Sequence, residues 1–193
     1  YSQNLGGGGS GTPVAGHRIS IQTTTRINKI AGCINTADQG GYGWGRIYPN
    51  TYLLSLYDQA KDTRYNELFV HRFKYNDPTS PKYGELIPLA KSSSYCETLH
   101  FMSKKYFDQW TMADNPDRTT GFKDLIVYRL AETYLMAAEA YMRRDGGMST
   151  DALRCYNKTW ERAGNDKFAG PLTQDILLDE YARELNFEGV RWP

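Results

Sequence analysis

The sequence has few cysteines and histidines, no excess of charge of either sign, and no long apolar run. Its 193 residues include 3 Cys and 3 His, and 23 basic residues stand against 22 acidic ones, for a net charge of +1. The odd, widely spaced cysteines exclude a disulfide framework, and the cysteines and histidines lack the spacing of zinc ligands. The neutral balance predicts no nucleic-acid surface. No segment approaches the ~20 apolar residues of a membrane helix, and no signal peptide is recognisable.

Motifs for cofactor binding or catalysis are also scarce. Gly6, Gly8 and Gly11 have the spacing of a dinucleotide fingerprint. That fingerprint needs a strand before it and a helix after it, whereas here no apolar strand precedes and Thr12-Pro13 follows. No serine or cysteine nucleophile has a base nearby. We therefore expect a flexible loop at these glycines, no cofactor and no catalytic residues.

Acidic residues supply two further candidate sites. A loose acidic loop contains Asp114, Asn115, Asp117 and Asp124. It lacks the alternating ligand spacing of a calcium loop, which favours a solvated turn. Glu132 and Glu139 lie two turns apart on one predicted helix, whereas a glycosidase needs its carboxylates on opposite sides of a sugar cleft. Solvent-facing or arginine-paired roles suit these two glutamates better, and no metal site is predicted.

Aromatic residues are abundant, at 13% of the chain with 15 Tyr and 4 Trp. Their flat apolar faces and polar edges suit sugar rings, and they equally suit packing between helices. Tyr42, Trp44 and Tyr48 lie in a glycine-rich segment, where little local structure exists to bury them, and Trp110 lies in a second loop-rich stretch. These are the candidate ligand-binding residues, with packing onto neighbouring helices as the alternative for each.

Glycine and proline mark an irregular first part of the chain. Residues 1–50 contain most of the glycine, and we expect loops there around a β-leaning stretch, residues 18–30. A helix is predicted over 51–60. Alternation over 67–75 places Phe69, Phe73 and Tyr75 on one side and predicts a strand. Prolines make 78–124 mostly loop, in which residues 99–110 fit either a short helix or a strand.

The residue pattern in the last third of the chain predicts helices. Apolar residues recur at helical spacing from Val127 to Met142, and Asp145-Gly146-Gly147 ends that helix. Ser149 or Thr150 caps a second helix, which stops at Gly164, and Thr173 caps a third that runs toward Gly189. The apolar face predicted for the third helix comprises Leu178, Tyr181, Ala182 and Leu185.

These elements predict a mainly α fold with tetratricopeptide-like helix pairs and a loop-rich, short-strand capping region. Residues 1–124 are the loop-rich region with one helix, and residues 125–193 are the helical segment, together forming one structural unit. A single helix pair cannot bury its own face, so this fold needs partner helices.

Several sequence blocks, in order, resemble the SusD/RagB family of outer-membrane nutrient-binding lipoproteins. They are Gly43–Leu54 continuing through Tyr57-Asp58 to Lys61–Tyr65, then Tyr128–Ala140, then Ala152–Gly164, and finally Ala182–Trp192 with its pattern Ala-Arg-Glu-Leu-x-Phe-Glu-Gly-x-Arg-Trp. The resemblance covers the C-terminal part of the family. The charged residues of the last block, Arg183, Glu184, Glu188 and Arg191, are expected to form structural ion pairs.

The resemblance implies a non-enzymatic receptor on the cell surface, held at the outer membrane by a lipid anchor that this chain does not include. Such a receptor binds an oligosaccharide or polysaccharide and passes it to a SusC-like TonB-dependent transporter. The alternative is a helical-repeat scaffold for protein–protein interaction. A glycan-cleaving enzyme is the third possibility.

Overall fold

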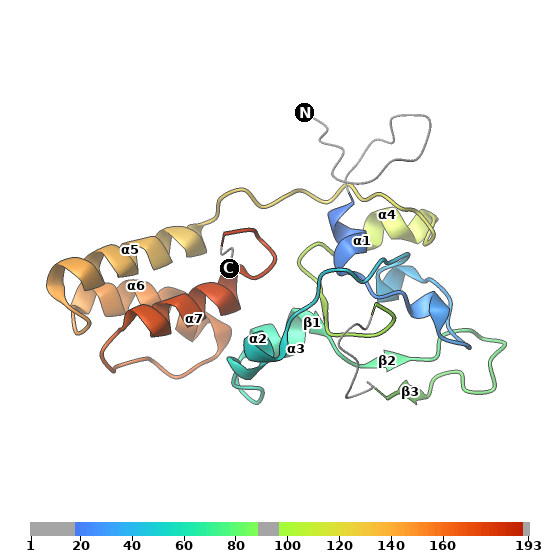
Figure 1. Cartoon of the computed structure of the whole chain (residues 1–193), viewed down its shortest axis with the longest axis horizontal. Coiled ribbons are helices and arrows are strands. Elements are labelled where there is room, and N and C mark those ends of the chain that lie inside the picture. The colour runs from blue at the N-terminus through green and yellow to red at the C-terminus, as the bar shows by residue number, and fades with distance from the viewer. Residues whose placement is uncertain (1–17, 89–96, 191–193) are drawn as a thin grey trace. The chain divides into compact units, whose positions relative to one another are not determined.

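The computed structural model describes residues 18–88 and 97–190, and over these residues the chain is mainly helical with a few short strands (Figure 1). The predicted fold class is confirmed. The chain divides into two compact units, Tyr1–Pro49 with Phe69–Asp124, and Asn50–Leu68 with Leu125–Pro193. Asn50–Leu68 groups with the C-terminal helices in this division, and the predicted arrangement of residues 1–124 and 125–193 as one structural unit stays a prediction. Within the described ranges no helix has the length and apolar character needed to cross a bilayer.

The second unit is built on three helices. α5 (Leu130–Asp145) and α6 (Thr150–Trp160) form the predicted pair, and α7 (Gln174–Leu185) packs against both (Figure 1). Ala138 and Ala152 are fully buried and lie in the core between the helices, where their small side chains allow close approach. The buried core comprises Leu135, Ala138, Ala152, Cys155, Tyr156, Leu172, Leu177 and Leu185.

Capping groups account for where these helices begin. The Ser149 hydroxyl accepts a hydrogen bond from Ala152 N at 3.5 Å, and the Thr173 hydroxyl accepts one from Ile176 N at 3.3 Å. α5 begins at Leu130 and not at Val127, which is 71% exposed and lies outside the helix. α7 ends at Leu185 and not at Gly189, because the backbone leaves the helical region at Asn186, whose ψ is 144°, and Phe187 then adopts a left-handed φ of 64°.

The predicted helix over 51–60 is shorter in the structure. α2 (Thr51–Ser55) is followed by a turn and then by α3 (Thr63–Glu67). The turn forms because the Asp58 carboxylate accepts a hydrogen bond from Ala60 N at 2.9 Å, while the Asp62 carboxylate caps α3 through Arg64 N at 3.0 Å. A short 3-10 helix, η3 (Glu161–Ala163), completes this unit's elements after α6.

The first unit combines short helices with two antiparallel strand pairs. Its helical elements are α1 (Ile19–Thr23), η1 (Ile27–Lys29), η2 (Ala37–Gln39) and α4 (Gln109–Asp114). β1 (Phe69–Val70) pairs with β4 (Met102–Ser103), placing Phe69 opposite Ser103. β2 (Phe73–Lys74) pairs with β3 (Leu86–Ile87), placing Phe73 opposite Ile87. The core around them contains Ile27, Cys33, Phe73, Ile87, Leu99 and Met102.

Two predictions for this unit need correction. The strand predicted over 67–75 is two separate strands, because β1 and β2 pair with different partners; Phe69 and Phe73 are nevertheless both buried, as the alternation predicts. The β-leaning stretch, residues 18–30, contains a helical turn, α1, in which the Thr24 hydroxyl donates to Ser20 O at 2.8 Å. Residues 99–110 contain β4 and the start of α4, so both alternatives occur there.

Candidate functional site

An open hollow of about 630 Å³ lies beside α4 in the first unit. Trp110, on the first turn of α4, is 91% exposed, and Phe122 is 53% exposed. The residues that line the hollow are Lys104, Phe107, Asp108, Gln109, Trp110, Phe122, Lys123 and Asp124. The hollow therefore combines aromatic rings with amide, ammonium and carboxylate groups on one concave surface.

Asp108 holds the wall of this hollow in place. Its buried carboxylate accepts hydrogen bonds from Phe122 N at 2.7 Å and from Lys123 N at 3.2 Å. The Lys123 ammonium in turn donates to Phe107 O at 3.2 Å. These bonds connect the residues before α4 to the segment after it, so the backbone that carries Trp110 and Phe122 is fixed on both sides.

The glycine-rich segment that carries the other three predicted residues is tightly packed. Burial alternates along it, with Gly41, Gly43 and Gly45 buried and the intervening residues partly exposed. A Cβ at Gly43 would lie 2.2 Å from Thr25 O, and one at Gly45 would lie 2.1 Å from Glu97 O. The glycines thus allow close backbone contact on one side, which places alternate side chains on the other.

Neither Trp44 nor Tyr48 is an isolated ring on this segment. The guanidinium carbon of Arg46 lies 4.7 Å from the centroid of the Trp44 ring, and that of Arg18 lies 5.5 Å from it. The Tyr48 ring contacts the His100 ring, with centroids 4.9 Å apart. Trp44 and Tyr48 are both half-buried, and other side chains of the protein already contact their rings.

The predicted residues therefore fall into different surroundings. Trp110 lines the hollow, whereas Tyr42, Trp44 and Tyr48 are not among its lining residues. Tyr42 is half-buried, and its backbone N donates to Pro116 O at 2.7 Å. The assignment of these four as ligand-binding residues remains a prediction.

Sequence reasoning missed three residues at these places. The sequence predicts only that Phe122 lies in a loop. No local pattern marks this residue as a wall of the hollow. The arginines beside Trp44 had one signal, since Arg46 is only two residues from Trp44 in the sequence. Arg18 is distant in sequence and has none.

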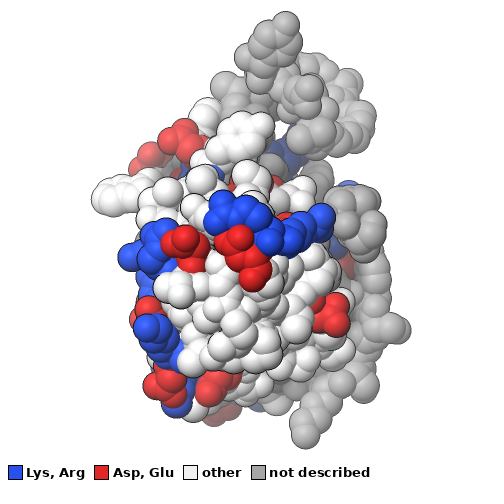
Figure 2. Space-filling model, turned by 90° about the vertical axis from the view of Figure 1, so that its left-hand side faces the viewer, with Lys and Arg blue, Asp and Glu red and all other residues white. Residues whose placement is uncertain are grey.

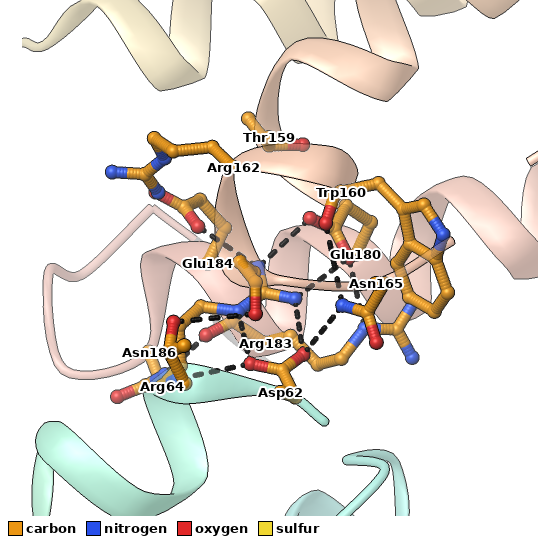
Figure 3. Close-up of polar contacts among 12 residues, drawn as sticks. Asp62, Arg64, Thr159, Trp160, Arg162, Asn165, Glu180, Arg183, Glu184 and Asn186 are labelled. Atoms are coloured by element: carbon orange, nitrogen blue, oxygen red, sulfur yellow. Dashed lines mark hydrogen bonds and ion pairs between the residues drawn. The ribbon is translucent and has the colours of Figure 1, made fainter. Parts of the chain in front are cut away.

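A buried ionic network centred on Arg64 occupies the second unit (Figure 3). The Arg64 guanidinium donates to Asp62 at 2.7 Å, to Glu180 at 2.8 Å and to Glu184 at 2.9 Å. Burial alone would lower the pKa of Arg64, but hydrogen bonds with Asp62 and Glu180 raise it. Arg183 bonds Glu180 at 2.8 Å from the same helix. Charged residues therefore form much of the inner face of α7, in place of part of the predicted apolar face.

Glu184 is the shared acceptor of this network. Its carboxylate pairs with Arg64, with Arg162 and, at 2.7 Å, with Arg129. Burial opposes ionisation of Glu184, but the hydrogen bond from Arg129 and the charges of Arg64 and Arg162 lower its pKa to about 2. Arg129 also pairs with Glu188 at 2.6 Å. The expected ion pairs of Arg183, Glu184 and Glu188 are confirmed, while Arg191 lies outside the described residues.

Two of the other acidic candidates have structural partners. The Asp117 carboxylate accepts a hydrogen bond from the Asn35 side-chain amide at 2.7 Å. Glu139 pairs with Arg143 at 2.5 Å along α5. Within residues 18–88 and 97–190, no three His, Cys, Asp or Glu side chains are grouped so as to hold a metal ion. The glycine fingerprint at Gly6 to Gly11 lies outside the described residues.

Comparison with known proteins adds a family match and three relatives. Residues 13–193 match the family model described as "SusD family". The starch-binding protein SusD of Bacteroides thetaiotaomicron is 40% identical over 68 residues, which are 35% of this chain and 12% of that protein.

Two solved structures share the fold. Surface glycan-binding protein A from Bacteroides uniformis matches with a TM-score of 0.52 and 24% identity, over 78% of this chain and 29% of that one. A SusD superfamily protein from Parabacteroides distasonis matches with a TM-score of 0.56 and 20% identity, over 86% of this chain and 32% of that one. The chain thus spans about a third of the length of these two structures.

Proposed function

The chain belongs to the SusD family, and from this premise we propose that it is part of a non-catalytic receptor that binds an oligosaccharide or polysaccharide. Two relatives support the ligand class by name, one as a starch-binding protein and one as a surface glycan-binding protein. A receptor of this kind acts by selective capture and release. Its affinity therefore comes from shape and polar complementarity.

The observation that carries the proposal on this chain is the exposed Trp110 ring at the hollow beside α4. A tryptophan that is 91% exposed contributes little to the stability of the fold, and the wall of the hollow at Phe122 is held by the Asp108 carboxylate. The apolar face of a sugar ring packs on such a surface, while its hydroxyls bond polar groups at the edge. Gln109 and Asp124 line the same hollow and supply such groups.

The expected affinity is modest. An aromatic contact contributes about 0.5–1.5 kcal/mol beyond burial. A site with two rings, Trp110 and Phe122, and a few hydrogen bonds therefore has a dissociation constant on the order of micromolar to millimolar. Weak binding suits a protein that must hand its ligand on.

The proposed setting is the outer face of an outer membrane. There the complete protein, held by a lipid anchor, presents glycan to a SusC-like TonB-dependent transporter. Tyr42, Trp44 and Tyr48 stay in the proposed binding surface together with Trp110.

The experiment is isothermal titration calorimetry of the chain against a panel of soluble neutral and acidic polysaccharides, with released reducing ends measured in parallel. We expect binding to at least one glycan and no release of reducing ends. Flat titrations across the whole panel would contradict the proposal, and released ends would instead indicate an enzyme.

A protein-binding scaffold is the second candidate, favoured by exposed apolar residues in the second unit. Val127 is 71% exposed, Tyr128 is 86% exposed and Leu130 is 66% exposed. Figure 2 shows a face of the molecule on which acidic and basic side chains lie beside each other around a broad area without charge. Co-purification with a transporter while all sugar titrations stay flat would favour this function.

A further inference from the structure

The segment from Gly43 to Arg46 presents its side chains from a rigid backbone. Trp44 N donates to Ile21 O at 2.7 Å, and Arg46 N donates to Gln22 O at 2.9 Å, which attaches the segment to α1. On its other side, Gly45 lies against the backbone of Glu97 so closely that a Cβ would meet the Glu97 carbonyl. Trp44 and Arg46 therefore project from a backbone that is held on both sides.

Trp44 is shared by two cations. Arg46 and Arg18 both place a guanidinium over the Trp44 ring, at 4.7 Å and 5.5 Å from its centroid. A guanidinium that stacks on a ring uses its flat face and keeps its N–H groups directed outward in its own plane. The Trp44 ring thus serves as a support that orients arginines, and the sugar-stacking role predicted for it is not the one this geometry favours.

Two guanidiniums, those of Arg18 and Arg46, lie over this ring. The backbone of Glu97 passes next to Gly45, but the Glu97 carboxylate pairs with Arg26 at 2.7 Å. Arg46 is exposed and makes no ion pair with any residue in the described part of the chain. Two guanidiniums over one ring repel each other, and an anion bound by Arg46 lowers that repulsion.

We propose that Arg18, Trp44 and Arg46 form a binding site for the acidic group of a saccharide. This inference rests on the proposed glycan-binding function and narrows its ligand to an anionic glycan. The recognised chemistry is a group of oxygens that carries negative charge, either the carboxylate of a uronic acid or a sulfate ester. The guanidinium N–H fork bonds such oxygens in pairs, which neutral sugar hydroxyls do not offer.

The test compares polygalacturonate, dextran sulfate and neutral dextran as probes of the whole chain by affinity electrophoresis and calorimetry. We expect at least one acidic polymer to bind about tenfold or more tightly than dextran, with affinity falling as salt rises. Polygalacturonate and dextran sulfate separate the carboxylate from the sulfate source.

The key variants are Arg46→Gln and Arg46→Lys, with Arg72→Gln as the charge-matched control on an exposed arginine of the same unit. We expect Arg46→Gln to weaken binding of the acidic polymer about tenfold and to leave dextran unchanged. Arg46→Lys should recover only part of the loss, since it keeps the charge and not the fork. Arg72→Gln should change neither.

The outcomes separate this inference from the proposed function. Binding of dextran alone would overturn the acidic site and leave the glycan-binding function standing. The site would also be overturned if Arg46→Gln does not weaken binding of the acidic polymer. The same holds if Arg72→Gln weakens that binding as much as Arg46→Gln does. Absence of binding to every glycan would overturn both. Thermal melting of each variant checks that the fold is kept. If Arg46→Gln does not fold, Arg46→Lys, which retains the charge, still tests the role of the guanidinium.

Discussion

Arg64 and Glu184 are 120 residues apart in the sequence and are joined by a hydrogen bond of 2.9 Å between the guanidinium and the carboxylate. Both side chains are almost completely buried, with 5% and 2% of their side-chain surface exposed. This pair links α3 to α7 and brings the central sequence block that resembles the SusD family into contact with the closing block.

Replacing Glu184 with glutamine should destabilise the second unit. Glu184→Gln keeps the shape of the side chain but leaves Arg64, Arg129 and Arg162 without their shared anion. Loss of one partner from a buried ion pair costs about 3–5 kcal/mol. Urea denaturation followed by circular dichroism measures the change. Glu161→Gln, on an exposed glutamate nearby, is the control and should cost little. Equal stabilities of the two variants would contradict the prediction.

The stability of the same unit should depend on pH through Glu184. Its pKa is lowered in the folded state to about 2 from 4.5. A lowered pKa stabilises the folded state above pH 4.5, and this contribution is lost as pH falls from about 5 toward 2. The shift corresponds to about 3 kcal/mol. We expect the stability difference between the wild type and Glu184→Gln to shrink between pH 6 and pH 3 by urea denaturation. If the stability difference between the two proteins stays constant over that pH range, Glu184 is not the source of the pH dependence.

Alanine at Gly45 should be far more damaging than alanine at Gly84. Both glycines have positive φ, 59° and 84° respectively, which an L side chain adopts at a cost of about 1–2 kcal/mol. At Gly84 no atom lies within 4 Å of the added Cβ, whereas at Gly45 the Glu97 carbonyl would lie 2.1 Å away. We expect Gly45→Ala to lower thermal stability by at least about 2 kcal/mol more than Gly84→Ala. Calorimetric melting of both variants tests this, and similar melting temperatures would show that the segment tolerates displacement.

Removing the Trp110 ring should weaken glycan binding without harming the fold. Trp110→Ala deletes a ring that is 91% exposed, so little buried surface is lost. A stacking contact of about 0.5–1.5 kcal/mol corresponds to a loss of affinity of roughly two- to tenfold. Tyr83→Ala, at a tyrosine that is 61% exposed outside the hollow, is the matched control. Calorimetry with a bound glycan should show the loss for Trp110→Ala only. Unchanged affinity would remove Trp110 from the site.

The helices of the second unit were predictable because their signals are local. Ser149 and Thr173 cap the helices they precede, and Gly146 and Gly164 end the helices they follow with positive φ of 87° and 88°. Capping and helical spacing involve residues within one or two turns of each other, so they can be recognised without tertiary contacts. The same locality made the charged pattern of Arg183, Glu184 and Glu188 identifiable as ion-pairing.

Other features depend on residues that are distant in sequence. The partners of those charges, Arg64 and Arg129, come from separate segments, and only folding brings them to α7. The division of one predicted strand into β1 and β2 depends on which strand each meets. Exposure also depends on distant neighbours, so only the tertiary structure distinguishes the open ring of Trp110 from that of Trp44, which lies beneath two arginines.

By itself, then, the sequence determined the helical class, the helix caps and the family to which the chain belongs, since each is written in short or ordered patterns of residues. The tertiary structure decided which charges meet, which glycines lie against other backbone and which aromatic rings remain accessible. The physical reason is that burial, ion pairing and steric contact arise between segments far apart in the chain, and no local pattern specifies them.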